Sequence, residues 1–146
     1  MNRTFAIAAI AAAMAFAGPA FAAEHEVLML NSNDTGNMVY EPAFLTVAPG
    51  DTIKFIPTDP SHNAESINEM TPEGAEPIKG KINEELEVTL TEEGIYGIKC
   101  TPHYAMGMGM LIEVGEGHEI TLPEKMPRGV QNRFDDILER AEREAS

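Results

Sequence analysis

Several short segments of the chain alternate strictly between apolar and polar residues. The clearest is residues 85–90, where leucine or valine at 86, 88 and 90 alternates with glutamate and threonine. A period of two places one face of a strand on a core and the other face in water. The same reasoning predicts further strands, separated by Pro-Gly or Glu-Gly turns, at residues 25–30, 44–47, 52–56, 94–100 and 110–114. No segment before residue 115 keeps a helical period, so the pattern predicts an all-β fold, and the strand spacing suits a β-sandwich.

Two regions interrupt this rhythm. Residues 58–81 are polar and rich in proline and glycine, which predicts a long loop beginning beside His62. Loops of that length inside compact domains are usually functional or disordered. In the tail, about residues 122–144, two prolines precede apolar residues that recur at helical spacing. A helical tail is therefore expected to cover one face of the sandwich.

The first residues have the pattern of an export signal. Arg3 precedes an apolar run over residues 5–17, and a Gly-Pro break leads to the small-residue pattern Ala20-Phe21-Ala22. Thirteen apolar residues fall short of the roughly 20 that a membrane-spanning helix needs. We therefore expect a cleaved signal peptide at residues 1–22, no membrane anchor, and a mature chain from Ala23 located in a bacterial periplasm.

Composition and charge narrow the classes of function. A chain of 146 residues suits one domain, here residues 23–146, around one core. Ten basic residues against 24 acidic ones give a formal charge of −14, which disfavours binding to nucleic acid. A single cysteine, Cys100, cannot form a disulfide within the chain and is available for other chemistry.

The candidate chemistry concentrates in residues 99–108, where Cys100, His103 and Met108 follow one another. Extending the alternation of the preceding strand, Tyr96, Ile98 and Cys100 share one face, so the sulfur is expected to point into the core. A trigonal site of two histidines and one cysteine with a weak axial methionine is typical of copper electron-transfer centres. The pattern therefore predicts one copper ion and requires a second histidine from elsewhere in the fold.

His62 is the candidate for that second histidine, because the long loop can bring it beside the cysteine. The two remaining histidines fit less well: His25 lies near the mature N-terminus and His118 lies in a charged segment beyond the last predicted strand. Both are expected to be solvated.

Three methionines alternate near the site. Met108 is assigned the axial position, Met106 is its rival, and Met110 is expected in the core at the start of the last strand. The same three residues leave open a different class of function, the storage or delivery of Cu(I). A thiolate and two imidazoles held by a rigid sandwich argue against it, since delivery sites favour exchange. Enzymatic nitrite reduction by this chain is disfavoured because no further histidine cluster exists to hold another copper.

The run Gly97-Ile98-Lys99-Cys100-Thr101-Pro102-His103-Tyr104, followed by Met106-Gly107-Met108 and preceded far upstream by Thr58-Asp59-Pro60-Ser61-His62-Asn63, closely resembles the pseudoazurins. The likeness extends over nearly all of the mature chain. It implies a cupredoxin fold, an eight-stranded Greek-key sandwich with two C-terminal helices. It also implies that His62, Cys100, His103 and Met108 bind copper, with His103 as the exposed ligand through which electrons pass.

The surroundings of the site are expected to support it. Asn63, next to His62, is placed to tie the two ligand loops together, and Thr101 and Pro102 stand in the second coordination shell. By resemblance, Met38, Pro102, Ala105 and Tyr104 belong to an apolar docking patch around His103. One departure is Ala105, which stands where relatives commonly carry glycine, and a backbone needing positive φ there would be strained.

The basic residues Lys79, Lys81 and Lys99 are expected to form a positive rim that steers the copper end toward an acidic partner. Here Pro60 stands where relatives often carry a lysine. The resemblance implies electron donation to a denitrification reductase, most often copper nitrite reductase, with c-type cytochromes as other partners. The protein is expected to be a monomer.

Overall fold

The computed structural model describes residues 21–146. The predicted signal peptide, residues 1–22, lies almost wholly outside them. Among the described residues no helix combines the length and the apolar character needed to cross a membrane.

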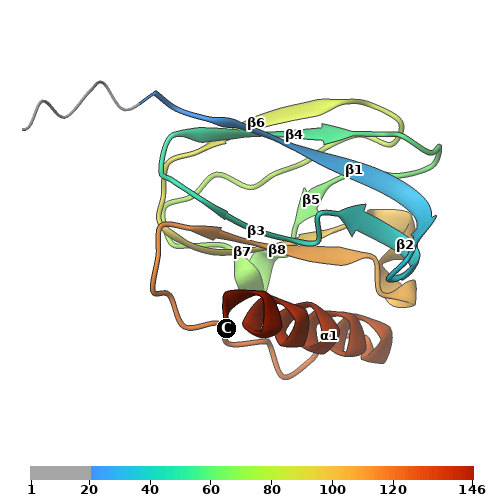
Figure 1. Cartoon of the computed structure of the whole chain (residues 1–146). Helices are drawn as coiled ribbons and strands as arrows, with labels where there is room; N and C mark the ends of the chain where they lie inside the picture. Colours follow the sequence, from blue (N-terminus) through green and yellow to red (C-terminus); the bar gives the residue numbers. More distant parts are fainter. Residues whose placement is uncertain (1–20) are drawn as a thin grey trace, which may run out of the picture.

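Within residues 21–146, eight strands form two packed sheets of four (Figure 1). In chain order they are β1 (Glu24–Asn33), β2 (Gly36–Glu41), β3 (Phe44–Val47), β4 (Asp51–Ile56), β5 (Glu65–Ser66), β6 (Leu86–Leu90), β7 (Gly94–Lys99) and β8 (Gly109–Val114). The sheet orders are β2-β1-β4-β6 and β3-β8-β7-β5, with β1 parallel to β4 and β3 parallel to β8. This confirms the predicted sandwich, and each predicted strand is present with ends shifted by at most three residues.

Strand β2 was missing from the prediction. Its apolar residues do not alternate, because Val39 and Tyr40 are adjacent in sequence and both are buried. The backbone at Met38 has a φ of 51°, which breaks the regular pleat just before them. A search for strict alternation cannot detect such a strand.

The predicted loop over residues 58–81 carries more structure than expected. It contains β5, which pairs with β7 and completes the second sheet, and a short 3₁₀ helix, η1 (Asn68–Met70). Its apolar residues are buried at irregular spacing, at Ala64, Ile67, Met70 and Ile78. Because the spacing is irregular, a search for periodic apolar residues does not detect this packing.

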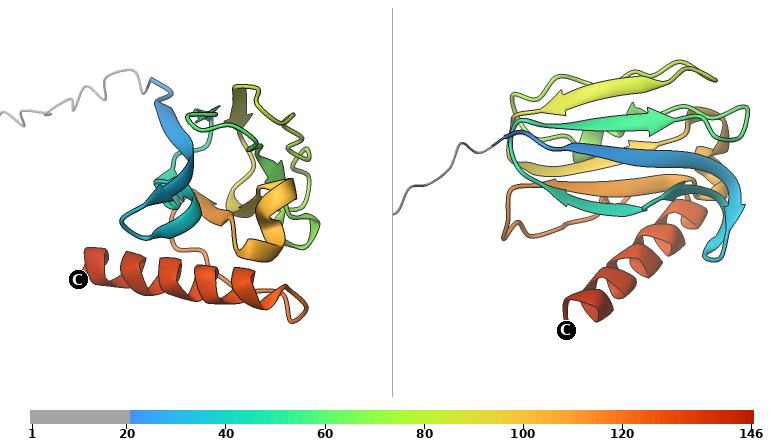
Figure 2. Two further views of the ribbon diagram at one scale, coloured as in Figure 1. Left: turned by 90° about the vertical axis from the view of Figure 1, so that its right-hand side faces the viewer. Right: turned by 45° about the horizontal axis from the view of Figure 1, so that its top comes forward.

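The predicted tail also differs from the structure. One α-helix, α1 (Arg128–Ala145), follows Pro127, whereas residues 122–127 are not helical. The described residues therefore contain one C-terminal α-helix and not the two that the resemblance implies. Figure 2 shows that α1 packs against the outer face of the second sheet, and its buried Val130, Phe134 and Ile137 contact the same apolar cluster as Leu111 of β8.

The main core lies between the two sheets. It is formed by alternate residues of the central strands, among them Val27, Ile53, Phe55 and Ile98, none of which is more than 1% exposed. Because successive strand residues point to opposite faces, β8 supplies Met110 to this core while its neighbour faces α1.

His25 and His118 were predicted to be solvated, but both are only partly exposed and each makes a polar contact within the fold. His25 Nε2 lies 2.9 Å from Asp51 Oδ2. This hydrogen bond is the largest of the contributions that hold the pKa of Asp51 below its ordinary value, and the backbone N–H groups of Ala23 and Ala48 add to it. The backbone N–H of His118 donates to Glu113 Oε2, and its Nε2 is buried without a hydrogen-bond partner among the described residues. Neighbouring residues therefore cover part of each histidine and leave the rest in contact with solvent.

Candidate metal centre

Cys100 follows the last residue of β7 and continues its alternation. Tyr96, Ile98 and Cys100 are all on the core side and at most 1% exposed, as predicted. The side chain of Cys100 therefore enters the interior at one end of the sandwich.

His103 and Met108 are placed by the ligand loop, residues 100–108, which contains the 3₁₀ helix η2 (Thr101–Met106). Two backbone bonds close the loop: Cys100 N–H donates to the Met108 carbonyl and Met108 N–H to the His103 carbonyl, both at 3.1 Å. The chain turns back through Gly107, whose φ of 96° is left-handed. Ala105 has no positive φ, so its Cβ causes no backbone strain here.

His62 comes from the segment after β4 and is fully buried. Its carbonyl accepts a hydrogen bond from Asn83 N–H at 3.0 Å, and the Asn83 side chain accepts one from Ser61 N–H at 2.6 Å. A turn 21 residues further along the chain thus holds the backbone that carries this ring.

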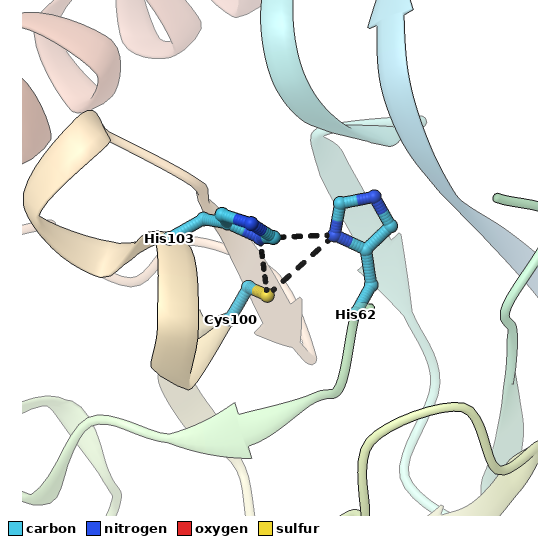
Figure 3. A group of neighbouring side chains, drawn as sticks. All are labelled: His62, Cys100 and His103. Carbon is cyan, nitrogen blue, oxygen red and sulfur yellow. Dashed lines mark hydrogen bonds between the residues drawn. The ribbon is translucent and has the colours of Figure 1, made fainter. Parts of the chain in front are cut away.

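Three side chains converge at this end of the molecule (Figure 3). Nδ1 of His62 lies 3.1 Å from Nδ1 of His103, and the Cys100 sulfur lies 3.7 Å and 3.4 Å from these two nitrogens. A point equidistant from the three atoms is about 2 Å from each, close to the bond lengths of metals to imidazole nitrogen and thiolate. The three donors fit a single metal ion.

Asn31 fixes which nitrogen of His62 faces the sulfur. The Asn31 side-chain oxygen lies 2.8 Å from His62 Nε2, and a carbonyl oxygen only accepts hydrogen bonds. Nε2 therefore carries the proton and Nδ1 presents its lone pair to the cluster. Asp59 in turn accepts a hydrogen bond from the backbone N–H of Asn31 at 2.7 Å.

Asn63 joins the two segments that carry the ligands. Its side-chain oxygen accepts the Thr101 N–H at 2.7 Å, and its amide nitrogen donates to the Thr101 hydroxyl at 3.1 Å and to the Gly80 carbonyl at 3.0 Å. The Thr101 hydroxyl donates to Glu65 on β5. The His62 segment, the ligand loop and the second sheet are thereby connected through one buried amide.

Burial shifts the proton affinities of the cluster. It lowers the pKa of His62, as does His103 to a smaller degree, while Asp59 acts in the opposite direction. Burial raises the pKa of the Cys100 thiol, and backbone N–H groups of Asn63 and His103 oppose this as hydrogen-bond donors. The imidazole is favoured in its neutral, ligating form, and a metal must displace the thiol proton on binding.

The structure separates the three methionines. Met108 and Met110 are fully buried in the core cluster that also contains Cys100, whereas Met106 is 58% exposed. Met108 is tied to His103 and Cys100 by the loop hydrogen bonds, so it lies with the ligands and Met106 lies at the surface.

Around the cluster, His103 is partly exposed while Pro102 and Ala105 are exposed beside it. Met38 is half-buried, and its carbonyl accepts a hydrogen bond from Arg133 of α1 at 3.1 Å. His103 is thus the ligand nearest to solvent, because His62 and Cys100 are both fully covered.

Two lysines of the predicted rim, Lys79 and Lys99, lie on either side of β5. The backbone of Glu65 on β5 pairs with Lys99 on one side and Lys79 on the other, which places an acidic residue between two basic ones. Lys79 and Lys81 are exposed, and the Lys99 ammonium lies 5.3 Å from the centre of the Tyr104 ring.

Two mixed sheets with a largely buried Cys-His-His-Met cluster at one end, of which His103 is partly exposed, define a cupredoxin, the class of β-sandwich that binds a single copper ion through these residue types. Residues 27–115 match the family of copper binding proteins described as plastocyanin/azurin. The chain is 53% identical over 131 residues to a pseudoazurin of Paracoccus pantotrophus, covering 88% of this chain and 90% of that protein. It is 49% identical over 111 residues to a pseudoazurin of Methylorubrum extorquens, covering 76% and 75%.

Comparison with solved structures leads to the same family. The crystal structure of pseudoazurin from Methylobacterium extorquens AM1 superposes with a TM-score of 0.73 at 40% identity, covering 81% of this chain and 98% of that one. The chain belongs to the pseudoazurin family. Its cofactor is copper, its site consists of His62, Cys100, His103 and Met108, and it is a blue copper electron-transfer protein and not an enzyme.

Sequence reasoning missed several residues that support the site. Asn31 and Glu65 contact it through hydrogen bonds across more than 30 positions of the chain, and no local pattern marks such partners. Gly107 could have been found from the sequence. A glycine between the ligands His103 and Met108 is a candidate for a left-handed backbone conformation that reverses the chain.

Proposed function

We propose that this protein carries single electrons in a bacterial periplasm and donates them to a denitrification reductase, with copper nitrite reductase as the main acceptor and c-type cytochromes as further partners. The observation that carries the proposal is the triangle of His62, Cys100 and His103, in which one ligand reaches the surface and two do not. The relatives named pseudoazurin support the class of carrier.

The donor set favours fast electron exchange. Bound copper supplies a one-electron couple between Cu(II) and Cu(I). The thiolate and thioether suit the reduced ion and the two imidazoles suit the oxidised one, so the mixed set partly satisfies both. Hydrogen bonds from Asn31, Asn63 and the loop backbone fix the ligands. Little movement accompanies oxidation, and the barrier that arises from rearrangement stays low.

The exposed edge of His103 provides the contact for the partner. Pro102 and Ala105 beside it are exposed and apolar, and they allow close approach without burying charge. We propose that Met38, Pro102 and the basic rim of Lys79, Lys81 and Lys99 form a small docking surface used by a monomer in brief encounters. The acidic remainder of the protein, with a formal charge of −14 for the whole chain, orients this end toward an acidic partner.

The alternative, storage or delivery of Cu(I) by a methionine cluster, gains no support from the described residues. Such a cluster would group Met106, Met108 and Met110 around one ion. Met106 is exposed while the other two are fully buried.

The test mixes the reduced, copper-loaded protein with a copper nitrite reductase and follows the thiolate-to-copper absorption after nitrite is added. The expected result is return of the absorption at a rate that depends on protein concentration. The Cys100→Ser variant, which lacks the thiolate, should show no such band. A wild-type protein that stays reduced with nitrite reductase but reacts with a c-type cytochrome would overturn the assignment of the partner.

Export is tested separately. Periplasmic extracts of bacteria that express the full chain should contain the blue protein, and its mass should correspond to a chain starting at Ala23. Recovery only in the cytoplasmic fraction would contradict the location.

A further inference from the structure

The start of β1 brings a backbone nitrogen and an imidazole to one carboxylate. The Ala23 nitrogen lies 2.9 Å from Asp51 Oδ1, and His25 Nε2 lies 2.9 Å from Asp51 Oδ2. Asp51 is only 6% exposed, whereas Ala23 and Glu24 are exposed and the His25 side chain is 26% exposed. The two groups are thus held near each other at an accessible place.

Cleavage before Ala23 changes the chemistry of this place. The nitrogen of Ala23 becomes a primary amine, and the histidine becomes the third residue of the chain. An amine, the amide nitrogens of Glu24 and His25, and the imidazole then follow one another as four nitrogen donors. Such a set closes small chelate rings in one plane, and tetragonal or square-planar nitrogen coordination suits Cu(II) and Ni(II).

We propose that Ala23-Glu24-His25, once it forms the N-terminus, binds one Cu(II) or Ni(II) ion at a second site separate from the blue copper centre. This inference rests on the proposed export and cleavage. Binding at neutral pH releases three protons, one from the ammonium group and one from each of the amides of Glu24 and His25. The oxidation state of the metal does not change.

Binding requires that the first residues of β1 give up contacts of the fold, including the bonds from Ala23 and His25 to Asp51 and the bond from Thr52 N–H to the Ala23 carbonyl. In the sheet, Glu24 pairs with Thr52 and His25 with Ile53, so the first residues of β1 must leave β4. Strand β2 pairs with β1 only from Leu28 onward, and chain ends open more easily than strand centres. His25 makes its one side-chain hydrogen bond through Nε2, which leaves Nδ1 free for the metal among the described contacts.

The second site lies far from the first. Asn31, which contacts the ligand His62, is eight residues further along β1 than Ala23. At about 3.3 Å per strand residue the two ends are about 26 Å apart. A metal at the N-terminus therefore leaves the blue centre unaltered, and the two can be read independently.

The experiment titrates a chain that begins at Ala23 with Cu(II), in the presence of glycine as a weak competing chelator, and follows paramagnetic resonance and visible absorption. The first equivalent is expected to give the blue thiolate signal. The second equivalent is expected to give a separate tetragonal signal with nitrogen coupling.

Three variants locate the second ion. One extra glycine before Ala23 moves the histidine out of the third position and should remove the second equivalent while the blue signal remains. His25→Gln should do the same, and the matched variant His118→Gln should retain both equivalents. The persistent blue signal shows that each variant is folded with an intact copper centre. The carrier function is tested separately, by reoxidation with the reductase.

Two results of the titration would overturn the inference. One is a wild-type chain that binds a single equivalent of Cu(II). The other is a second equivalent that still binds to the variant with an extra glycine residue before Ala23. An exported protein whose mass shows a start other than Ala23 would also overturn it.

Discussion

Asn31 shows how one residue sets the chemistry of another that lies 31 positions away. Its side-chain oxygen selects the tautomer of His62 and so aims a lone pair at the sulfur. Asn63 acts differently, because it ties the backbone of the ligand loop to the His62 segment. Each residue supports the metal centre without being a ligand, and each can be tested alone.

Replacing Asn31 by alanine should weaken metal binding by roughly 10- to 100-fold, the usual effect of losing the partner that orients a histidine ligand. The hydrogen bond from its backbone to Asp59 stays, so folding should be little affected. Competition with a chelator for Cu(I) or Zn(II) measures the affinity. Asn37→Ala, at an exposed residue of β2, is the control and should bind like wild type.

Replacing Asn63 by alanine should lower the free energy of unfolding of the metal-free protein by about 1–3 kcal/mol, because the Thr101 N–H loses its acceptor in a part-buried place. Urea unfolding measures this loss. The exposed Asn132→Ala on α1 should stay within about 0.5 kcal/mol of wild type. Equal stabilities for the two variants would show that the Asn63 bonds contribute nothing to folding.

At the scale of elements, α1 packs against the ligand loop, residues 100–108, which carries three of the ligands, and against the start of β8. The ring of Phe134 packs so closely on Gly109 that an added Cβ there would lie 2.8 Å from it. The backbone of Gly129 approaches Gly107 with similar tightness, since a Cβ at Gly107 would lie 2.6 Å from the Gly129 carbonyl oxygen. Arg133 adds hydrogen bonds to the Asn37 and Met38 carbonyls of β2.

Phe134→Ala should cost about 3–5 kcal/mol of stability, since it removes a fully buried ring and leaves a cavity between α1 and β8. Ile137→Val, one turn further on the same face, should cost only about 0.5–1.5 kcal/mol. Thermal and urea unfolding of the copper-loaded proteins give both values. Similar losses in the two variants would contradict the close packing of the helix on the sheet.

Whether an element could be predicted from the sequence depended on whether a local pattern of residues marks it. Strands β6 and β4 alternate regularly, so the sequence predicted them to within a residue. Strand β2 has a break at Met38, and β5 is two residues long and exists only because β7 pairs with it. Cys100, His103 and Met108 lie within nine residues and were predicted from spacing, whereas Asn31 joins the site only through folding.

On the scale of the whole molecule, charge is distributed unevenly around the copper end. The chain carries 24 acidic and 10 basic residues, yet Lys79 and Lys99 flank the sheet edge beside the ligand loop. Between them Glu65 weakens the local positive field. Long-range steering therefore depends on a few lysines.

Lys99→Glu should slow electron transfer to an acidic partner several-fold at low salt and reduce the dependence of the rate on ionic strength, because surface charges are screened beyond about 10 Å at 0.1 M salt. Stopped-flow measurement across a range of salt concentrations tests this. Lys54→Glu is the matched control, because Lys54 lies on β4 of the first sheet and forms an ion pair with Glu85 there. An unchanged salt dependence in Lys99→Glu would remove Lys99 from the docking surface.

The sequence by itself determined the class of fold and the chemistry of the centre, because alternation and the spacing of Cys100, His103 and Met108 are local properties of the chain. Tertiary structure alone decided that His62 meets Cys100, that Met106 is exposed, and that His25 is paired with Asp51. The reason is physical: contacts between distant residues depend on how strands pair and sheets pack, and short patterns along the chain do not encode these contacts.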